Sequence, residues 1–258
     1  MCYEPTDRPP IAPMAGGSVE TDELELVASD GNHLAAFGAR TGDRPSPHAV
    51  LILPDVRGLH PFYVALAERF AEAGVDALAI DYFGRTAGVA HRPDDFPYME
   101  HREQTTWAGL SADIEAGGRA LAAPGRPVYT VGFCFGGRLS FLSAGLREPG
   151  FAGVVGFYGV LGMSNRFAVP APIEVAGSFG CPVLGLFGGA DPAVPADQVT
   201  DFERALGAAG VAHELVTYPD APHSFFDRKA TEYAAASADA WRRVLTFVGA
   251  PAGEEGRA

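Results

Sequence analysis

The 258-residue sequence has little positive charge and no long apolar run. Its 19 Lys and Arg residues stand against 32 Asp and Glu residues, which gives a formal net charge of −13. An acidic surface of this kind disfavours nucleic acids and anionic membranes as partners. No stretch approaches the roughly 20 apolar residues that a membrane-spanning helix needs. We therefore expect a protein that binds neither nucleic acid nor membrane.

Cysteine is also scarce. The three cysteines, Cys2, Cys134 and Cys181, are too few and too scattered for a disulfide framework. The first residues contain no apolar stretch like that of a signal peptide. Both absences favour a cytoplasmic location, where the reducing environment would also keep a catalytic thiol reduced.

The order of sequence patterns predicts an α/β fold. Hydrophobic residues make up 47% of the chain, which is enough to build the core of one large domain. Segments 23–29 and 33–39 have the alternation and turn of an antiparallel hairpin. After residue 48, fully apolar strands alternate with helices, as in a mostly parallel sheet that is covered on both faces. We therefore predict a mostly parallel sheet of about eight strands, edged by the hairpin.

We find no linker that divides the core, so a single domain is expected. The prediction is an extended arm at 1–20, an α/β domain at 21–248 and a flexible tail at 249–258. Segment 86–102 is polar and contains proline, which predicts a loop or cap over the strand ends. The expected helices span 62–73, 103–122, 138–146, 196–208 and 231–248.

The most informative stretch is Gly132-Phe-Cys134-Phe-Gly136, which follows an apolar strand and precedes a predicted helix. A strand-to-helix turn this sharp has no room for bulk two residues before and after its apex, where the two glycines stand. Cys134 would project from the apex at the amino end of the helix, where the helix dipole favours a thiolate. The stretch has the pattern of a nucleophile elbow with Cys in place of Ser.

Two other interpretations of Cys134 stay open. A lone cysteine is most often a small buried apolar residue. A redox-sensing thiol is the other alternative, although no resolving cysteine lies near it in the sequence. The flanking glycines and the preceding strand favour the nucleophile.

A cysteine nucleophile needs a base, and the base needs an orienting group. In parallel sheets, functional groups gather in the loops at the carboxyl ends of the strands. Asp191 lies in such a loop, and His223 follows the last predicted strand. Their order after Cys134 is that of nucleophile, acid and histidine in α/β-hydrolases. The alternatives are an Asp that starts a turn before Pro192 and a surface histidine.

An oxyanion hole needs two hydrogen-bond donors aimed at the developing negative charge. The N–H of Phe135 directly follows the nucleophile and would supply one donor. The other is expected from the loop after the strand at 50–53, at Val56. Topology alone supports this assignment, because backbone donors leave no mark in the sequence.

These motifs together resemble those of the dienelactone hydrolases, carboxymethylenebutenolidase-type α/β-hydrolases with a Cys-His-Asp triad. The resemblance implies that Cys134, Asp191 and His223 form the triad. It also implies that the N–H groups of Val56 and Phe135 form the oxyanion hole. It covers roughly residues 20–248, and the matching motifs are P-D-V-R-G at 54–58, D-Y-F-G-R at 81–85, G-F-C-F-G-G at 132–137, G-G-A-D at 188–191 and P-H-S-F at 222–225.

The resemblance also implies roles in substrate binding. Asp55 stands where family members have a Glu that interacts with the resting thiol, and Arg85 falls on one of two arginines that hold a substrate carboxylate. Asp227 stands near the second arginine position, and Arg57 is a candidate replacement. With Asp227 in place, the site is expected to favour a different or uncharged ester. The candidate apolar pocket residues are Tyr158, Phe83, Phe135 and Phe226.

The sequence therefore predicts an enzyme that hydrolyses a small ester or lactone through a cysteine nucleophile and an acyl-enzyme intermediate. The expected partner is the small-molecule substrate, and neither a metal nor an organic cofactor is expected. The alternative is a non-hydrolytic relative that binds a small ligand and keeps the elbow as architecture. The oligomeric state stays open.

Overall fold

The computed structural model describes residues 8–13, 18–42, 46–90, 92, 95–163 and 168–250. Within them, eight strands form one sheet, in the order β1-β2-β4-β3-β5-β6-β7-β8. β2 pairs antiparallel with β1 and β4, and the remaining neighbours are parallel. The predicted fold class is confirmed. The strands are β1 (Val19–Val27), β2 (His33–Thr41), β3 (Ala49–Leu53), β4 (Asp76–Ile80), β5 (Val128–Phe133), β6 (Gly153–Phe157), β7 (Val183–Gly188) and β8 (His213–Tyr218).

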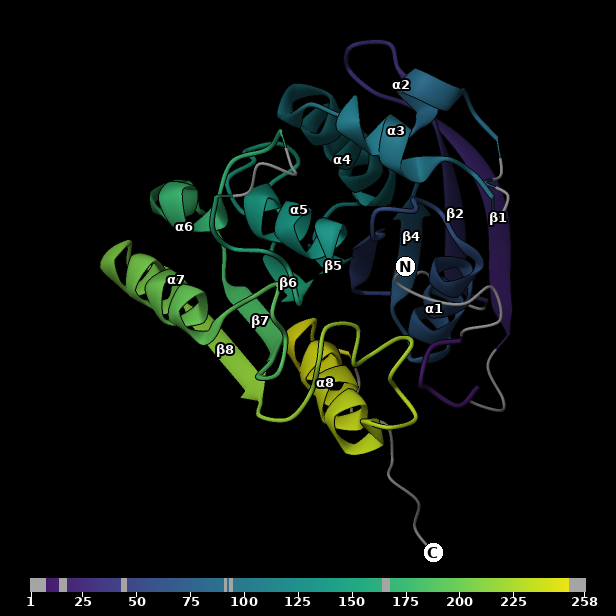
Figure 1. Cartoon of the computed structure of the whole chain (residues 1–258). Helices are drawn as coiled ribbons and strands as arrows, with labels where there is room; N and C mark the ends of the chain where they lie inside the picture. Colours follow the sequence, from purple (N-terminus) through teal and green to yellow (C-terminus); the bar gives the residue numbers. More distant parts are fainter. Residues whose placement is uncertain are drawn as a thin grey trace, which may run out of the picture.

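Helices cover both faces of the sheet (Figure 1). α1 and α8 pack on one face, and α4, α5 and α7 pack on the other. Because both faces are covered, β3, β6 and β7 are buried along their whole length, as their apolar sequences predict. The helices are α1 (Pro61–Glu72), α2 (Gly84–Ala87), α3 (Tyr98–Glu103), α4 (Trp107–Leu121), α5 (Phe135–Ser143), α6 (Pro172–Val175), the 3₁₀ turn η1 (Ala176–Ser178), α7 (Ala196–Ala208) and α8 (Ala234–Phe247).

Three helix predictions were wrong at their amino ends. The helix expected at 231–248 begins at Ala234. The helix expected at 103–122 begins at Trp107, because the hydroxyl of Thr106 accepts the N–H of Gly109 at 3.2 Å and caps it. The preceding residues form α3, so segment 86–102 contains helical turns as well as loop. The helix expected at 138–146 begins at Phe135, so the elbow passes directly into α5.

The described residues cover only part of the predicted arm and tail. β1 starts at Val19, inside the arm predicted for residues 1–20, and the division otherwise stays a prediction. Residues 1–7, 14–17 and 251–258, which include Cys2 and most of the predicted tail, lie outside the described residues. None of the described helices is long and apolar enough to cross a membrane.

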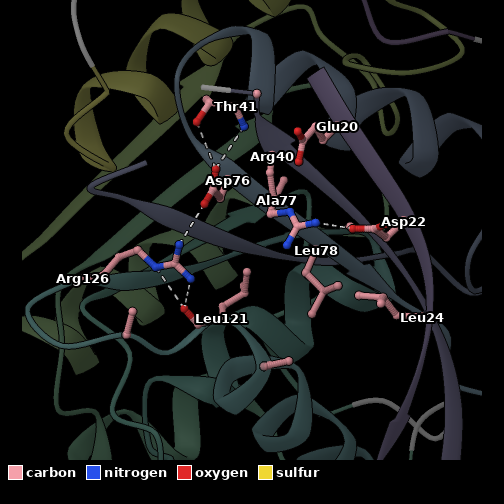
Figure 2. A pocket seen from close by; sticks show the side chains of 14 residues that line it. Glu20, Asp22, Leu24, Arg40, Thr41, Asp76, Ala77, Leu78, Leu121 and Arg126 are labelled. Carbon is pink, nitrogen blue, oxygen red and sulfur yellow. Dashed lines mark hydrogen bonds and ion pairs between the residues drawn. The ribbon is translucent and has the colours of Figure 1, made fainter. Parts of the chain in front are cut away.

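The amino edge of the parallel strands buries an ion pair (Figure 2). Asp76, the first residue of β4, is 1% exposed. It accepts hydrogen bonds from the N–H of Thr41 at 3.2 Å and from Nη1 of Arg126 at 2.8 Å. Nε of Arg126 also donates to the carbonyl of Leu121 at 3.0 Å. The pair lines a cavity of about 510 Å³ beside the β1–β2 hairpin.

Candidate active site

Cys134 lies at the apex of a strained turn between β5 and α5, with φ of 53° and ψ of −110°. A β-carbon added at Gly132 would lie 1.9 Å from the carbonyl oxygen of Gly136. One added at Gly136 would lie 2.0 Å from the carbonyl oxygen of Leu53. The predicted steric reason for the two glycines is thus confirmed. Strain of this kind costs free energy and is typical of functional sites.

The loops after β7 and β8 meet backbone to backbone beside this turn. The N–H of Gly189 donates to the carbonyl of Tyr218 at 2.8 Å, and the N–H of Ala190 donates to that of Ala221 at 3.0 Å. A β-carbon at Gly189 would lie 2.3 Å from the carbonyl oxygen of Pro219, so the approach depends on glycine. This contact brings the Asp191 loop against the His223 loop.

Asp191 and His223 form a hydrogen-bonded pair. Nδ1 of His223 donates to Oδ2 of Asp191 at 2.7 Å, while Oδ1 of Asp191 accepts the N–H of Ala193 at 2.8 Å. Because a carboxylate only accepts, the proton is on Nδ1, and Nε2 is the nitrogen left for the thiol. Asp191 thereby fixes both the ring orientation and the tautomer.

His223 is also coupled to Cys134. Burial alone would lower the pKa of His223, but hydrogen bonds with Asp191 and Cys134 and their charges raise it to about 10. These contacts favour the charged form of the imidazole. A cysteine beside an imidazolium and at the amino end of a helix is favoured as a thiolate. The arrangement supports a resting thiolate–imidazolium pair.

The loop that carries Val56 is a tight turn held by Asp55. Oδ1 of Asp55 accepts the N–H of Arg57 at 2.9 Å, and the carbonyl of Asp55 accepts the N–H of Gly58 at 3.2 Å. The N–H of Asp55 donates to the hydroxyl of Tyr63 at 2.9 Å. Phe135, the other predicted oxyanion donor, is the first residue of α5. These positions agree with the predicted oxyanion roles, which stay predictions.

Sequence reasoning missed Asp81, which supports the same loop. This fully buried carboxylate follows β4 and accepts the N–H of Leu59 at 3.2 Å and the N–H of Phe83 at 2.8 Å. It also pairs with Arg92 at 2.9 Å, which ties the segment after α2 to the strand ends. An acid directly after an apolar strand was the available signal, since such positions lie at the functional edge of a parallel sheet.

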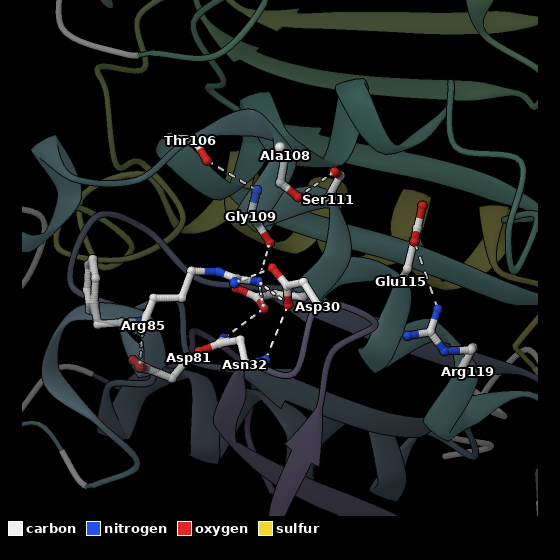
Figure 3. Close-up of polar contacts among 12 residues, drawn as sticks. Asp30, Asn32, Asp81, Arg85, Thr106, Ala108, Gly109, Ser111, Glu115 and Arg119 are labelled. Carbon is white, nitrogen blue, oxygen red and sulfur yellow. Dashed lines mark hydrogen bonds and ion pairs between the residues drawn. The ribbon is translucent and has the colours of Figure 1, made fainter.

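The predicted arginines differ in their surroundings. Arg57 lies beside the site, with Nε 3.8 Å from Oδ2 of Asp55. Arg85 pairs with Asp30 and Asp113, at 2.8 Å for the latter, and donates to the carbonyl of Gly109 at 3.0 Å (Figure 3). The structure thus holds Arg85 between the β1–β2 turn and α4. Its role in substrate binding stays a prediction, and these contacts favour a structural role.

The predicted apolar residues form two groups. Tyr158 is fully buried, and its ring centroid lies 4.8 Å from that of His223. Phe226 packs in the core beneath the elbow, and its ring centroid lies 4.7 Å from that of Phe157. The ring centroid of Phe83 lies 5.5 Å from that of Phe96, which belongs to the segment between α2 and α3. Tyr158 thus contacts a residue of the predicted triad, and the substrate contacts of all four predicted apolar residues stay predictions.

The described residues contain no group of three or more His, Cys, Asp or Glu side chains arranged to hold a metal ion.

The sheet order and the elbow define an α/β-hydrolase. The chain belongs to the dienelactone hydrolase family, whose model matches residues 35–251. It is thus a hydrolase of the dienelactone hydrolase type.

Individual relatives match over almost their whole length. A protein of Escherichia coli (strain K12) named "Putative carboxymethylenebutenolidase" is 30% identical over 261 residues, which cover 93% of each chain. A Bradyrhizobium sp protein named "Probable 2-oxo-3-(5-oxofuran-2-ylidene)propanoate lactonase" is 27% identical and covers 91% of this chain and 96% of its own. The crystal structure of a "Putative Dienelactone Hydrolase" from Klebsiella pneumoniae superposes with a TM-score of 0.76 at 27% identity, covering 90% of this chain and 99% of the other.

Proposed function

We propose that this protein hydrolyses small esters or lactones with Cys134 as nucleophile, His223 as acid and base, and Asp191 as the orienting group. The observation that carries the proposal is the continuous hydrogen-bonded series from Asp191 through His223 to Cys134 at the strained elbow. The names of the matched relatives, a butenolidase and a lactonase, agree with this substrate class.

The chemistry divides into two steps. The Cys134 thiolate attacks the carbonyl carbon, and the N–H groups of Val56 and Phe135 stabilise the oxyanion. The carbon–oxygen bond to the leaving group then breaks, and His223 donates its proton to the departing oxygen. In the second step, neutral His223 takes a proton from water, which attacks the thioester. The acid product leaves, and Cys134 departs as the thiolate beside the imidazolium.

Charge in the site favours a substrate without a carboxylate next to the reacting carbonyl. Asp55 and Asp227 are 1% and 5% exposed, and the charge of Asp55 is one cause of the raised pKa of Asp227. A substrate carboxylate would bring a second negative charge to a site that already holds the charge of Asp55. Arg57 is the nearest candidate counter-charge, and it already lies beside Asp55.

The test compares cysteine variants in the hydrolysis of p-nitrophenyl acetate and of paired lactones with and without a carboxylate. Cys134→Ala is expected to abolish turnover. Cys181→Ala is the matched control, because Cys181 is also partly buried but burial raises its pKa to about 11. Turnover that survives in Cys134→Ala contradicts the nucleophile. Faster hydrolysis of the carboxylated lactone contradicts the substrate preference.

A further inference from the structure

Tyr158 occupies a conformation that side chains rarely adopt. It follows β6 directly, with φ of 39°, and its side chain is fully buried. Its N–H donates to the carbonyl of Leu186 at 2.8 Å, so the backbone is held from β7. Its hydroxyl donates to Oδ2 of Asp227 at 2.8 Å. A strained aromatic residue with a fixed hydroxyl partner points to a positional role.

This hydrogen bond joins the two halves of the triad by a second route. On one side, the N–H of Cys134 donates to the carbonyl of Phe157 at 3.0 Å, and Tyr158 is the next residue. On the other side, the N–H of Asp227 donates to the carbonyl of Ser224 at 3.2 Å, and Ser224 follows His223. The contact between Tyr158 and Asp227 therefore ties the elbow to the histidine loop.

The histidine loop is itself strained and needs such a tie. Ser224 has φ of 63°, and its carbonyl accepts hydrogen bonds from the N–H groups of Asp227 and Lys229, each at 3.2 Å. Oδ1 of Asp227 accepts the N–H of Arg228. The loop is thus folded around Asp227, whose carboxyl is 5% exposed and points at Tyr158.

We propose that Asp227 and Tyr158 form a brace that positions His223 against Cys134. The brace rests on the proposed function, because it positions the proposed base relative to the proposed nucleophile. The ionisable groups that act on it are Asp55, Tyr63, His223 and Cys134. Desolvation and the charge of Asp55 raise the pKa of Asp227 to about 8, although the hydrogen bonds from Arg228 and Tyr158 and the charge of His223 lower it. Asp227 thus adds little negative charge to the site at neutral pH.

The test removes the brace from either end and measures kcat and KM together with the rate at which iodoacetamide alkylates Cys134. Asp227→Ala and Tyr158→Phe should each lower kcat by about tenfold or more, with KM almost unchanged. The double variant should lose no more than the worse single variant, because both remove one contact. Asp227→Asn keeps an acceptor oxygen and should recover most of the rate lost in Asp227→Ala.

Tyr218→Phe is the matched control. Its hydroxyl donates to Asp239 at 3.0 Å, in a second tyrosine–aspartate pair that does not involve the triad, and kcat should stay at the wild-type value. Circular dichroism at the assay temperature checks that each variant is folded. Additive losses in the double variant, or a wild-type kcat in Tyr158→Phe, would overturn the brace.

Alkylation separates failure of the brace from failure of the proposed function. In the wild type, the alkylation rate of Cys134 should be nearly constant from about pH 6 to pH 9, because the imidazolium holds the thiolate. In Asp227→Ala and Tyr158→Phe, the rate at pH 7 should fall and then rise with pH. A wild-type rate that climbs with pH contradicts the ion pair of the proposed function. A constant rate in the wild type and in both variants contradicts the brace alone.

Discussion

At the amino edge of the sheet, Asp76 is buried against Arg126 and Thr41, whereas at the carboxyl edge Asp227 is buried against Tyr158 and faces the second acid Asp55. The first aspartate has a cation at 2.8 Å. The second accepts hydrogen bonds from the neutral hydroxyl of Tyr158 and from the backbone N–H of Arg228. Both are almost fully buried, so burial alone does not distinguish a structural acid from one in an active site.

The difference lies in pairing and strain. Among the described residues, the positive-φ positions other than glycine are Cys134, Tyr158 and Ser224, and all three lie at the carboxyl edge. The pKa values of His223 and Asp227, at the same edge, move in the direction that leaves a charged imidazole beside a protonated acid. We conclude that the carboxyl edge carries the candidate catalytic groups, whereas the buried ion pair at the amino edge stabilises the fold. Substitutions at the two edges should therefore separate activity from stability.

The largest expected effect is on catalysis, at Asp191. Asp191→Asn should lower kcat by about 10⁴-fold, because the amide would allow His223 to present the wrong nitrogen to the thiol. The free energy of unfolding should change far less than the activation free energy. Steady-state kinetics and urea unfolding on the same samples check both quantities. A loss of kcat below about tenfold would leave Asp191 without an orienting role.

The next effect is on stability, at the amino edge. Arg126→Ala leaves Asp76 buried without its cation and should lower the free energy of unfolding by about 3 kcal/mol. Because the site lies at the opposite edge, kcat should stay at the wild-type value. Urea unfolding followed by tryptophan fluorescence measures the first quantity. A kinetic defect in a folded Arg126→Ala variant would break the comparison between the edges.

A smaller effect should appear in the pH dependence of stability. Asp227 has a pKa of about 8 in the folded chain and about 3.9 when unfolded. Between these values the native state holds a proton that the unfolded state has released, so stability from this group falls as pH rises from about 4 to 8. Asp227→Asn removes this titration. Its Tm relative to the wild type should therefore rise between pH 5 and pH 8, and a constant difference would contradict the buried protonated acid.

The smallest effect on catalysis concerns Arg85. Its contacts with Asp30 and Asp113 favour a structural role, and Asp113 is fully buried, so Arg85→Ala should lower the free energy of unfolding by about 3 kcal/mol, as Arg126→Ala does. KM for neutral esters should not change. If KM for a carboxylated lactone alone rises in this variant, the family role in substrate binding applies to Arg85 after all.

Much of the fold could be predicted because its signals are local. Uninterrupted apolar strands, the hairpin turn and the paired glycines around Cys134 each depend on neighbours in the sequence. The start of α5 at Phe135 was missed, since the strained turn at Cys134 is held by a hydrogen bond from its N–H to the carbonyl of Phe157, which is distant in the sequence.

The site was less predictable because its partners are distant in the chain. Arg85 and Asp113 are 28 residues apart, and Tyr158 and Asp227 are 69 apart. The position of an arginine in a sequence motif does not indicate which carboxylate it will pair with in the fold. The single hydroxyl that faces Asp227 likewise leaves no pattern in the sequence. Such pairings depend on the register of the sheet and the packing of its loops.

The proposed hydrolysis depends on an acyl group carried by Cys134, which intact-mass analysis after rapid mixing with p-nitrophenyl acetate would detect. We expect an acetyl adduct that forms within the first turnover, maps to the peptide containing Cys134, and clears as substrate is exhausted. The adduct should be absent in Cys134→Ala and unchanged in Cys181→Ala. Turnover with no adduct on Cys134, or an adduct that persists on another residue, would contradict Cys134 as the nucleophile.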